Sequence, residues 1–155
     1  MEKLKIMFLL ITGVLTFIGA CLPWWTVTDL FFGTEITVHF NPIFGASYIP
    51  ATLLSSVVGI IAMIGGVFLF VALKSRNVGT VGGFIAIIAV ISFIPVFYID
   101  DLGGGIVWGE TLGLFDQLTV GLHDLTTYLG YGWYLTLIGA VLGIIASRMM
   151  EHDVA

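Results

Sequence analysis

The chain has 155 residues, of which 59% are hydrophobic and only 10% are charged. An average soluble domain has about 25% charged residues, and a soluble fold of this size could not bury so much apolar surface. The formal net charge is −5 with only five Lys and Arg residues, too few to neutralise a run of phosphates, so we expect no nucleic-acid partner.

Four stretches without a charged residue are long enough to cross a bilayer, whose core of about 30 Å needs about 20 helical residues. They occupy residues 6–23, 51–73, 78–99 and 128–147. The connections are an outer loop at 24–50, an inner turn at 74–77, an outer loop at 100–127 and a tail at 148–155. A backbone exposed to lipid must satisfy its own hydrogen bonds, so the spans should be helices. The sequence therefore predicts a single membrane domain, an all-α bundle of four transmembrane helices with a small extracellular cap.

The basic residues predict which way the chain is oriented. All five lie on one side of a four-span arrangement, and the two outer loops contain none; they are Lys3, Lys5, Lys74, Arg76 and Arg148. The outer loops instead hold seven acidic residues. This is the positive-inside distribution. We expect a multi-pass protein of the plasma or cytoplasmic membrane, with both termini cytoplasmic and an electronegative outer surface.

The N-terminal span has an alternative interpretation. Residues 1–21 also resemble a secretory signal, and Ile18 to Cys21 resembles a bacterial lipoprotein cleavage box. Cleavage there would leave three spans and a lipidated Cys21. Because Cys21 is the only cysteine, no disulfide can form within the chain.

The first outer loop has the pattern of a β-hairpin. Residues 35–40 alternate polar and apolar side chains, residues 25–31 do so in part, and Gly33 lies between them. Ile36, Val38 and Phe40 should share one face, with Glu35, Thr37 and His39 on the other.

The second outer loop contains two patterns. Residues 106–112 could form a third strand or a small hairpin. From Leu112 to Leu129, leucine and phenylalanine recur every three or four residues, which predicts an amphipathic helix that leads into the fourth span.

The chain shows no pattern of a catalytic or cofactor site. Intramembrane ionisable residues mark ion paths and proton relays, and the four spans have none. A metal site built from His39 and His123 with nearby carboxylates is conceivable, but no ligand spacing supports it. We therefore expect no enzyme, no cofactor and no metal.

Two sets of residues are candidates for contacts. The outer-loop candidates are large apolar side chains that could anchor a partner: Trp24, Trp25, Ile36, Val38, Phe40 and Trp108. The helix-packing candidates are glycines in rows of small residues, which let helices approach closely: Gly59, Gly66, Gly79, Gly83, Gly139 and Gly143. These rows serve either packing within the bundle or association with another membrane subunit.

The layout resembles the claudin and peripheral-myelin-protein-22-like tetraspan superfamily. The resemblance rests on Leu22-Pro23-Trp24-Trp25 before the hairpin, Gly82-Gly83-Phe84 in the third span, and Gly130 to Trp133 at the start of the fourth. It implies a four-helix bundle with an extracellular β-sheet. The Gly-Leu-Trp signature and the paired loop cysteines of that family are absent, so paracellular sealing or pore formation is not implied.

These observations favour a non-enzymatic structural or accessory subunit that acts through lateral helix packing and an acidic extracellular cap. Its partners would be the lipid bilayer and either a second copy or another membrane subunit. Two alternatives remain open at this point. One is an oligomeric cation channel or small-molecule carrier, and the other is a subunit that contributes helices to a membrane enzyme complex.

Overall fold

The computed structural model describes residues 2–46, 50–73, 75–99, 113–115, 117–120 and 123–149. Within these residues the chain forms four helices, α1 (Glu2–Cys21), α2 (Leu53–Val71), α3 (Arg76–Ile99) and α4 (Tyr131–Met149). All four are long and apolar enough to cross a membrane. The predicted helical spans are confirmed, with ends shifted by a few residues.

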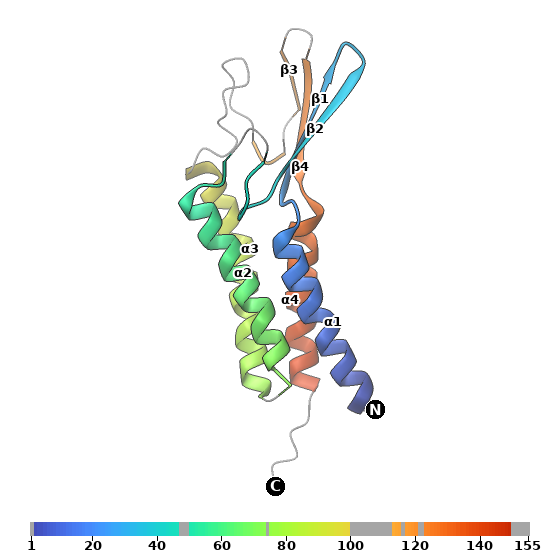
Figure 1. Cartoon of the computed structure of the whole chain (residues 1–155), viewed down its shortest axis with the longest axis vertical. Helices are drawn as coiled ribbons and strands as arrows, with labels where there is room; N and C mark the ends of the chain where they lie inside the picture. Colours follow the sequence, from blue (N-terminus) through green and yellow to red (C-terminus); the bar gives the residue numbers. More distant parts are fainter. Residues whose placement is uncertain are drawn as a thin grey trace.

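A small antiparallel sheet lies at one end of the bundle (Figure 1). Its strands are β1 (Trp25–Phe31), β2 (Thr34–Phe40), β3 (Gln117–Val120) and β4 (His123–Leu129), in the order β2-β1-β4-β3. β1 and β2 form the predicted hairpin, closed by the pair Phe31 and Thr34. Register places Ile36, Val38 and Phe40 on one face, as predicted, because they pair with Asp29, Val27 and Trp25.

The predicted helix over residues 112–129 is wrong where the structure describes this segment. Residues 123–129 form β4, and their burial alternates: Leu125, Thr127 and Leu129 are buried, whereas Asp124 and Tyr128 are exposed. Leu125 and Leu129 are four residues apart, so they share a face both in a helix and in a strand. Thr126, Thr127 and Tyr128 have strand-favouring side chains, and β1 offers an edge with unpaired backbone groups. The candidate strand at 106–112 lies outside the described residues.

The helices form a ring in which α1 packs on α2, α2 on α3, α3 on α4 and α4 on α1. The first residue of α1 and the last of α4 lie at the end away from the sheet (Figure 1). Because β1 follows α1 almost directly and β4 leads into α4, the paired strands β1 and β4 extend the paired helices α1 and α4.

Many of the residues inside this ring are small or carry a hydroxyl group, and they pack beside a few large side chains such as Leu69 and Phe93; most other large apolar residues face outward. In α4 the buried residues are Gly132, Thr136, Gly139, Ala140, Gly143, Ala146 and Ser147. By contrast, Ile138 and Ile145 are 50% and 47% exposed. A soluble bundle has the opposite distribution, because water drives large apolar side chains inward. Hydrocarbon imposes no such drive, so small residues that allow close packing face inward.

Hydroxyl groups inside the bundle bond to carbonyls of their own helix. The Thr16 hydroxyl donates to the carbonyl of Thr12, the Thr136 hydroxyl to that of Gly132, and the Ser147 hydroxyl to that of Gly143, each at 2.8 Å. A buried polar group without a partner costs free energy, and these bonds avoid that cost without water. The interior is therefore compatible with a surrounding solvent that offers no hydrogen bonds.

Candidate functional site

The connection between bundle and sheet is built around the last turn of α1. A helix ends with carbonyl groups that have no partner in the helix, and in this chain side chains supply the partners. The indole N–H of Trp24 donates to the carbonyl of Gly19 at 2.9 Å. The amide of Asn41 donates to the carbonyls of Ala20 at 3.2 Å and Leu22 at 2.9 Å. The end of α1 is thus bonded directly to the end of β2.

Asn41 also organises the turn that follows β2. Its side-chain oxygen accepts hydrogen bonds from the backbone N–H groups of Ile43 and Phe44, at 2.8 and 3.0 Å. Asn41 is 7% exposed, and its side chain makes four hydrogen bonds. The side-chain oxygen and the side-chain NH₂ group of an asparagine can all be bonded in this way only where backbone partners are held in place around the side chain. Asn41 was not among the residues predicted from the sequence. The local signal that marks it is a polar residue between Phe40 and Pro42, after a predicted strand.

The entry to α4 is joined to the same place. The N–H of Gly130 donates to the carbonyl of Trp24 at 2.8 Å, and the N–H of Gly132 to that of Pro23 at 2.9 Å. A Cβ atom on Gly132 would lie 2.6 Å from the carbonyl oxygen of Leu22. The glycines therefore let the chain of α4 pass directly against the chain that leaves α1.

The aromatic candidates Trp24, Trp25 and Phe40 lie inside the protein, which corrects their assignment to an outer contact surface. Their exposed fractions are 0%, 1% and 0%. The ring of Trp24 packs edge-on against Phe93, with centroids 5.3 Å apart, and Trp25 packs against Phe97 at 4.9 Å. Both phenylalanines come from α3. The tryptophans therefore fasten the sheet to the bundle, and they are not available to a partner.

Of the other outer-loop candidates, Ile36 is exposed and Val38 is half-buried. Trp108 lies outside the described residues. Two buried polar atoms have no hydrogen-bond partner within the described part of the chain, the indole nitrogen of Trp25 and Oδ1 of Asp29.

The two histidines lie on opposite faces of the sheet. His39 pairs in register with Thr26, and its Nδ1 lies 3.2 Å from the Thr26 hydroxyl. His123 pairs with Phe31 on the other face, where its ring stacks on Phe31 at 4.3 Å and its Nδ1 lies 2.9 Å from Asp29 Oδ2. Register thus separates the residues of the conceivable metal site. Among the residues that the structure describes, no three His, Cys, Asp or Glu side chains gather as a metal site would need.

The six helix-packing glycines all lie at contacts within this chain. Gly66 faces the backbone of Phe17 in α1, Gly79 and Gly83 face α4, Gly139 faces Thr16, and Gly143 faces Leu69. Gly59 faces the side chain of Ile43, in the turn after β2. At these glycines, neighbouring segments of the same chain approach closely and hold the bundle and the turn together. The glycine surfaces are therefore already covered by this chain.

The tip of the hairpin is a feature that the sequence analysis missed. Phe32 and Gly33 form the two-residue connection, with φ of 49° and 78°. Such a turn needs positive φ at both central residues, which is why Asn-Gly is the preferred sequence there. Phenylalanine rarely adopts this backbone conformation, yet Phe32 is 72% exposed, and its ring packs edge-on against the neighbouring Phe31 with centroids 4.6 Å apart. The local signal that marks this tip in the sequence is a phenylalanine immediately before the turn glycine, where asparagine is usual.

A comparison with protein-family models found no match, and a comparison with curated proteins found no relative.

Proposed function

We propose that this chain is a non-enzymatic, four-span integral membrane protein that serves as a structural or accessory subunit. It binds a partner protein through the exposed outer half of its hairpin. The observation that carries the partner-binding role is Phe32, a largely exposed aromatic ring on a backbone conformation that disfavours phenylalanine. Strained residues persist where the surrounding structure imposes them, and they concentrate at functional sites.

The membrane setting is supported by the distribution of side chains in the bundle. Large apolar side chains cover the outside of all four helices, while glycine, alanine, serine and threonine are frequent on the inside. Exposing this surface to water would create a continuous apolar patch far larger than soluble monomers carry.

The proposed orientation puts the sheet outside and both termini in the cytoplasm. All five basic residues of the sequence belong to the inner segments, and the loops that carry the sheet hold seven acids. Cysteines introduced singly at Glu35 and Ser75, in a Cys21→Ser background, test this orientation in intact cells. An impermeant thiol reagent should label position 35 and leave position 75 unlabelled. The reverse pattern would overturn the orientation.

The surroundings of Phe32 fit a protein partner. Leu30 and Ile36 are 42% and 53% exposed on opposite faces of the hairpin, so each face has an apolar side chain near the tip. Glu35 lies on the same hairpin and is exposed. A partner surface that suits this arrangement has an apolar pocket for the aromatic ring and a basic rim. Central aromatic anchors supply most of the binding energy in such contacts, and charges at the rim steer association.

Lateral association through the glycine rows has less support than binding through the cap. The glycines contact other parts of the same chain, so they offer no open groove to another helix. Conduction through one copy has no support either, because Phe93, Phe97, Trp24 and Leu69 fill the described interior. The hairpin carries exposed apolar side chains outside the spans, Leu30, Phe32 and Ile36.

The substitution Phe32→Asn tests partner binding without damaging the turn, because asparagine tolerates positive φ. Phe44→Asn is the matched control, since Phe44 is 71% exposed but lies in the turn after β2. Each full-length variant is purified from native membranes and its co-purified proteins are quantified. We expect Phe32→Asn to reduce the bound partner by about tenfold, the effect of losing a hot spot worth roughly 1.4 kcal/mol, and Phe44→Asn to retain it. Equal recovery with both variants, or a wild-type chain that is purified alone as a monomer, would refute the proposal.

A further inference from the structure

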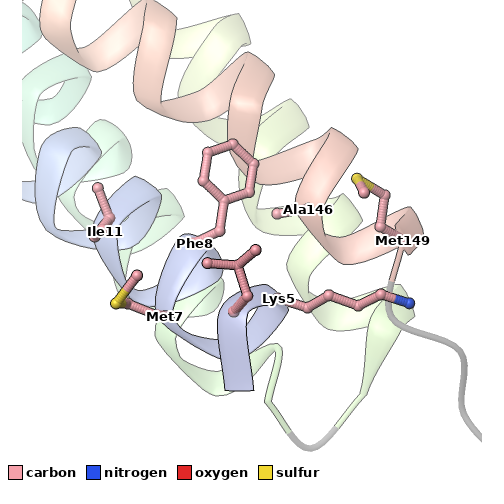
Figure 2. A pocket seen from close by; sticks show the side chains of 7 residues that line it. Lys5, Met7, Phe8, Ile11, Ala146 and Met149 are labelled. Atoms are coloured by element: carbon pink, nitrogen blue, oxygen red, sulfur yellow. The ribbon is translucent and has the colours of Figure 1, made fainter. Parts of the chain in front are cut away.

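A groove of about 270 Å³ lies between α1 and α4 at the end of the bundle away from the sheet (Figure 2). On the α1 side it is lined by Leu4, Lys5, Phe8 and Ile11, and on the α4 side by Ala146 and Met149. Since a water molecule occupies about 30 Å³ in the liquid, the groove has room for roughly nine groups of that size. It is too large for an ion alone and suits a segment of hydrocarbon chain.

The groove follows from where the two helices are able to touch. Near the sheet, Gly19 faces Thr136 and Gly139 faces Thr16, so the backbones of α1 and α4 are in close contact there. Toward the other end α1 diverges from α4 (Figure 1). Ala146, on α4, has too small a side chain to fill the space that opens between them.

The walls of the groove are almost entirely apolar, and one positive charge lies beside it. Lys5 is the charged residue among the side chains that line the groove, and it extends from α1 toward the last turn of α4 beside Met149 (Figure 2). The sequence also places two further basic residues of α1 and α4 at this end, Lys3 and Arg148, and one acidic residue, Glu2. The first-turn N–H groups of α1 lie at the same end and favour a nearby anion.

We propose that this groove binds one anionic phospholipid of the surrounding membrane. An acyl chain lies along Phe8, Ile11 and Ala146, and the phosphate pairs with the ammonium group of Lys5. Apolar walls recognise the chain, and the lysine recognises the charge of the headgroup. The proposal rests on the membrane setting proposed above, but not on the partner bound by the hairpin.

Native mass spectrometry of the detergent-solubilised full chain tests this binding. Phosphatidylglycerol and phosphatidylcholine with identical acyl chains are titrated against wild type, Lys5→Gln and Lys3→Gln. Lys3 is exposed, lies on the same helix and does not line the groove. Lys3→Gln removes the same charge as Lys5→Gln, so it is the matched control. We expect Lys5→Gln to lower the affinity for phosphatidylglycerol about fivefold, with Lys3→Gln closer to wild type. Equal losses in the two variants would mean general attraction to a basic surface, and would overturn the proposal.

A second pair of variants tests the apolar part of the groove. Ile11→Trp places a larger side chain in the groove, whereas Ile18→Trp adds the same group on the same helix outside it; the two isoleucines are 45% and 48% exposed. We expect Ile11→Trp to weaken binding of both lipids and Ile18→Trp to leave it unchanged. Unchanged lipid binding in Ile11→Trp would overturn the proposal. A dimer that Ile11→Trp abolishes would also overturn it, since a second copy would then occupy the groove. Release of the chain from membranes by alkaline carbonate, without detergent, would instead refute the membrane setting itself.

Discussion

The contact between α1 and α4 near the sheet offers the sharpest test of how the bundle is held together. Gly139 faces Thr16 and Gly19 faces Thr136, so each helix presents a Thr-x-x-Gly sequence to the other. A Cβ atom at position 139 would lie 2.6 Å from the Thr16 hydroxyl oxygen, 2.7 Å from the Thr16 nitrogen and 3.0 Å from the Thr12 carbonyl oxygen. Two of these three atoms belong to the backbone, so no side-chain rotation can relieve the overlap.

We expect Gly139→Ala to force α1 and α4 apart and destabilise the protein. Ordinary contact needs about 3.5 Å, so the helices must separate locally by about 1 Å. Overpacking of this kind costs about 1–3 kcal/mol. Helix propensity has the opposite sign, because alanine is favoured over glycine in a helix interior by about 1 kcal/mol. A net loss of stability therefore reports the interhelical contact.

Equilibrium unfolding in mixed micelles, followed by tryptophan fluorescence, measures the effect. Ile138→Ala is the control, since Ile138 is the preceding residue on the same helix and is 50% exposed on the outer surface. We expect the control to change the free energy of unfolding by less than Gly139→Ala does. A Gly139→Ala protein that is more stable than wild type, by the roughly 1 kcal/mol that helix propensity alone supplies, would refute the close contact between the helices.

Further predictions concern the sheet and its attachment. Asn41→Ala should cost about 2–4 kcal/mol of unfolding free energy in the same assay, because it leaves carbonyl and N–H groups at the end of α1 and in the next turn without partners. Trp24→Phe should cost less, about 1–3 kcal/mol, since it removes one hydrogen bond to the Gly19 carbonyl and part of the ring. An unchanged free energy of unfolding would contradict that hydrogen bond. Phe32→Asn should leave stability unchanged or raise it by about 1 kcal/mol, and a clear loss would show that the ring supports the fold. Cysteines at Thr28 and Thr126, which pair between β1 and β4, should form a disulfide in a Cys21→Ser background. The pair at Thr28 and Thr127 should not, because its side chains point to opposite faces, and equal cross-linking of both pairs would contradict the register.

The helices and the hairpin could be predicted because their patterns are local. A span needs only a run of uncharged residues, and residues 35–40 alternate strictly. The strand at residues 123–129 could not be predicted in this way. Its leucines fit either period, and the partner that decides between them, β1, lies almost a hundred residues earlier in the chain. Pairing between such distant segments is set by tertiary structure, which a single-window pattern does not contain.

The candidate site shows the same division between residue type and environment. The two tryptophans after the first span predicted a partner contact from residue type alone. Both tryptophans are instead buried because α3 places Phe93 and Phe97 against their rings. The sequence around the tryptophans does not specify this contact. Asn41 was equally hidden, because its role depends on the end of α1, about twenty residues away.

The exposed hairpin tip and the buried junction are parts of one arrangement. A two-stranded hairpin alone is marginally stable, so its outer half can project only if its base is fixed. Trp25, Val27 and Phe40 supply that base, because they are buried against α3 and the neighbouring strand. Beyond Val27, the side-chain links between the hairpin and β4 include the pair of Asp29 with His123 and the stacking of Phe31 on His123. Phe32 is therefore held in a costly backbone conformation by strands that are themselves anchored in the bundle. Its ring touches Phe31 and is otherwise exposed, which is the arrangement that the proposed partner contact requires.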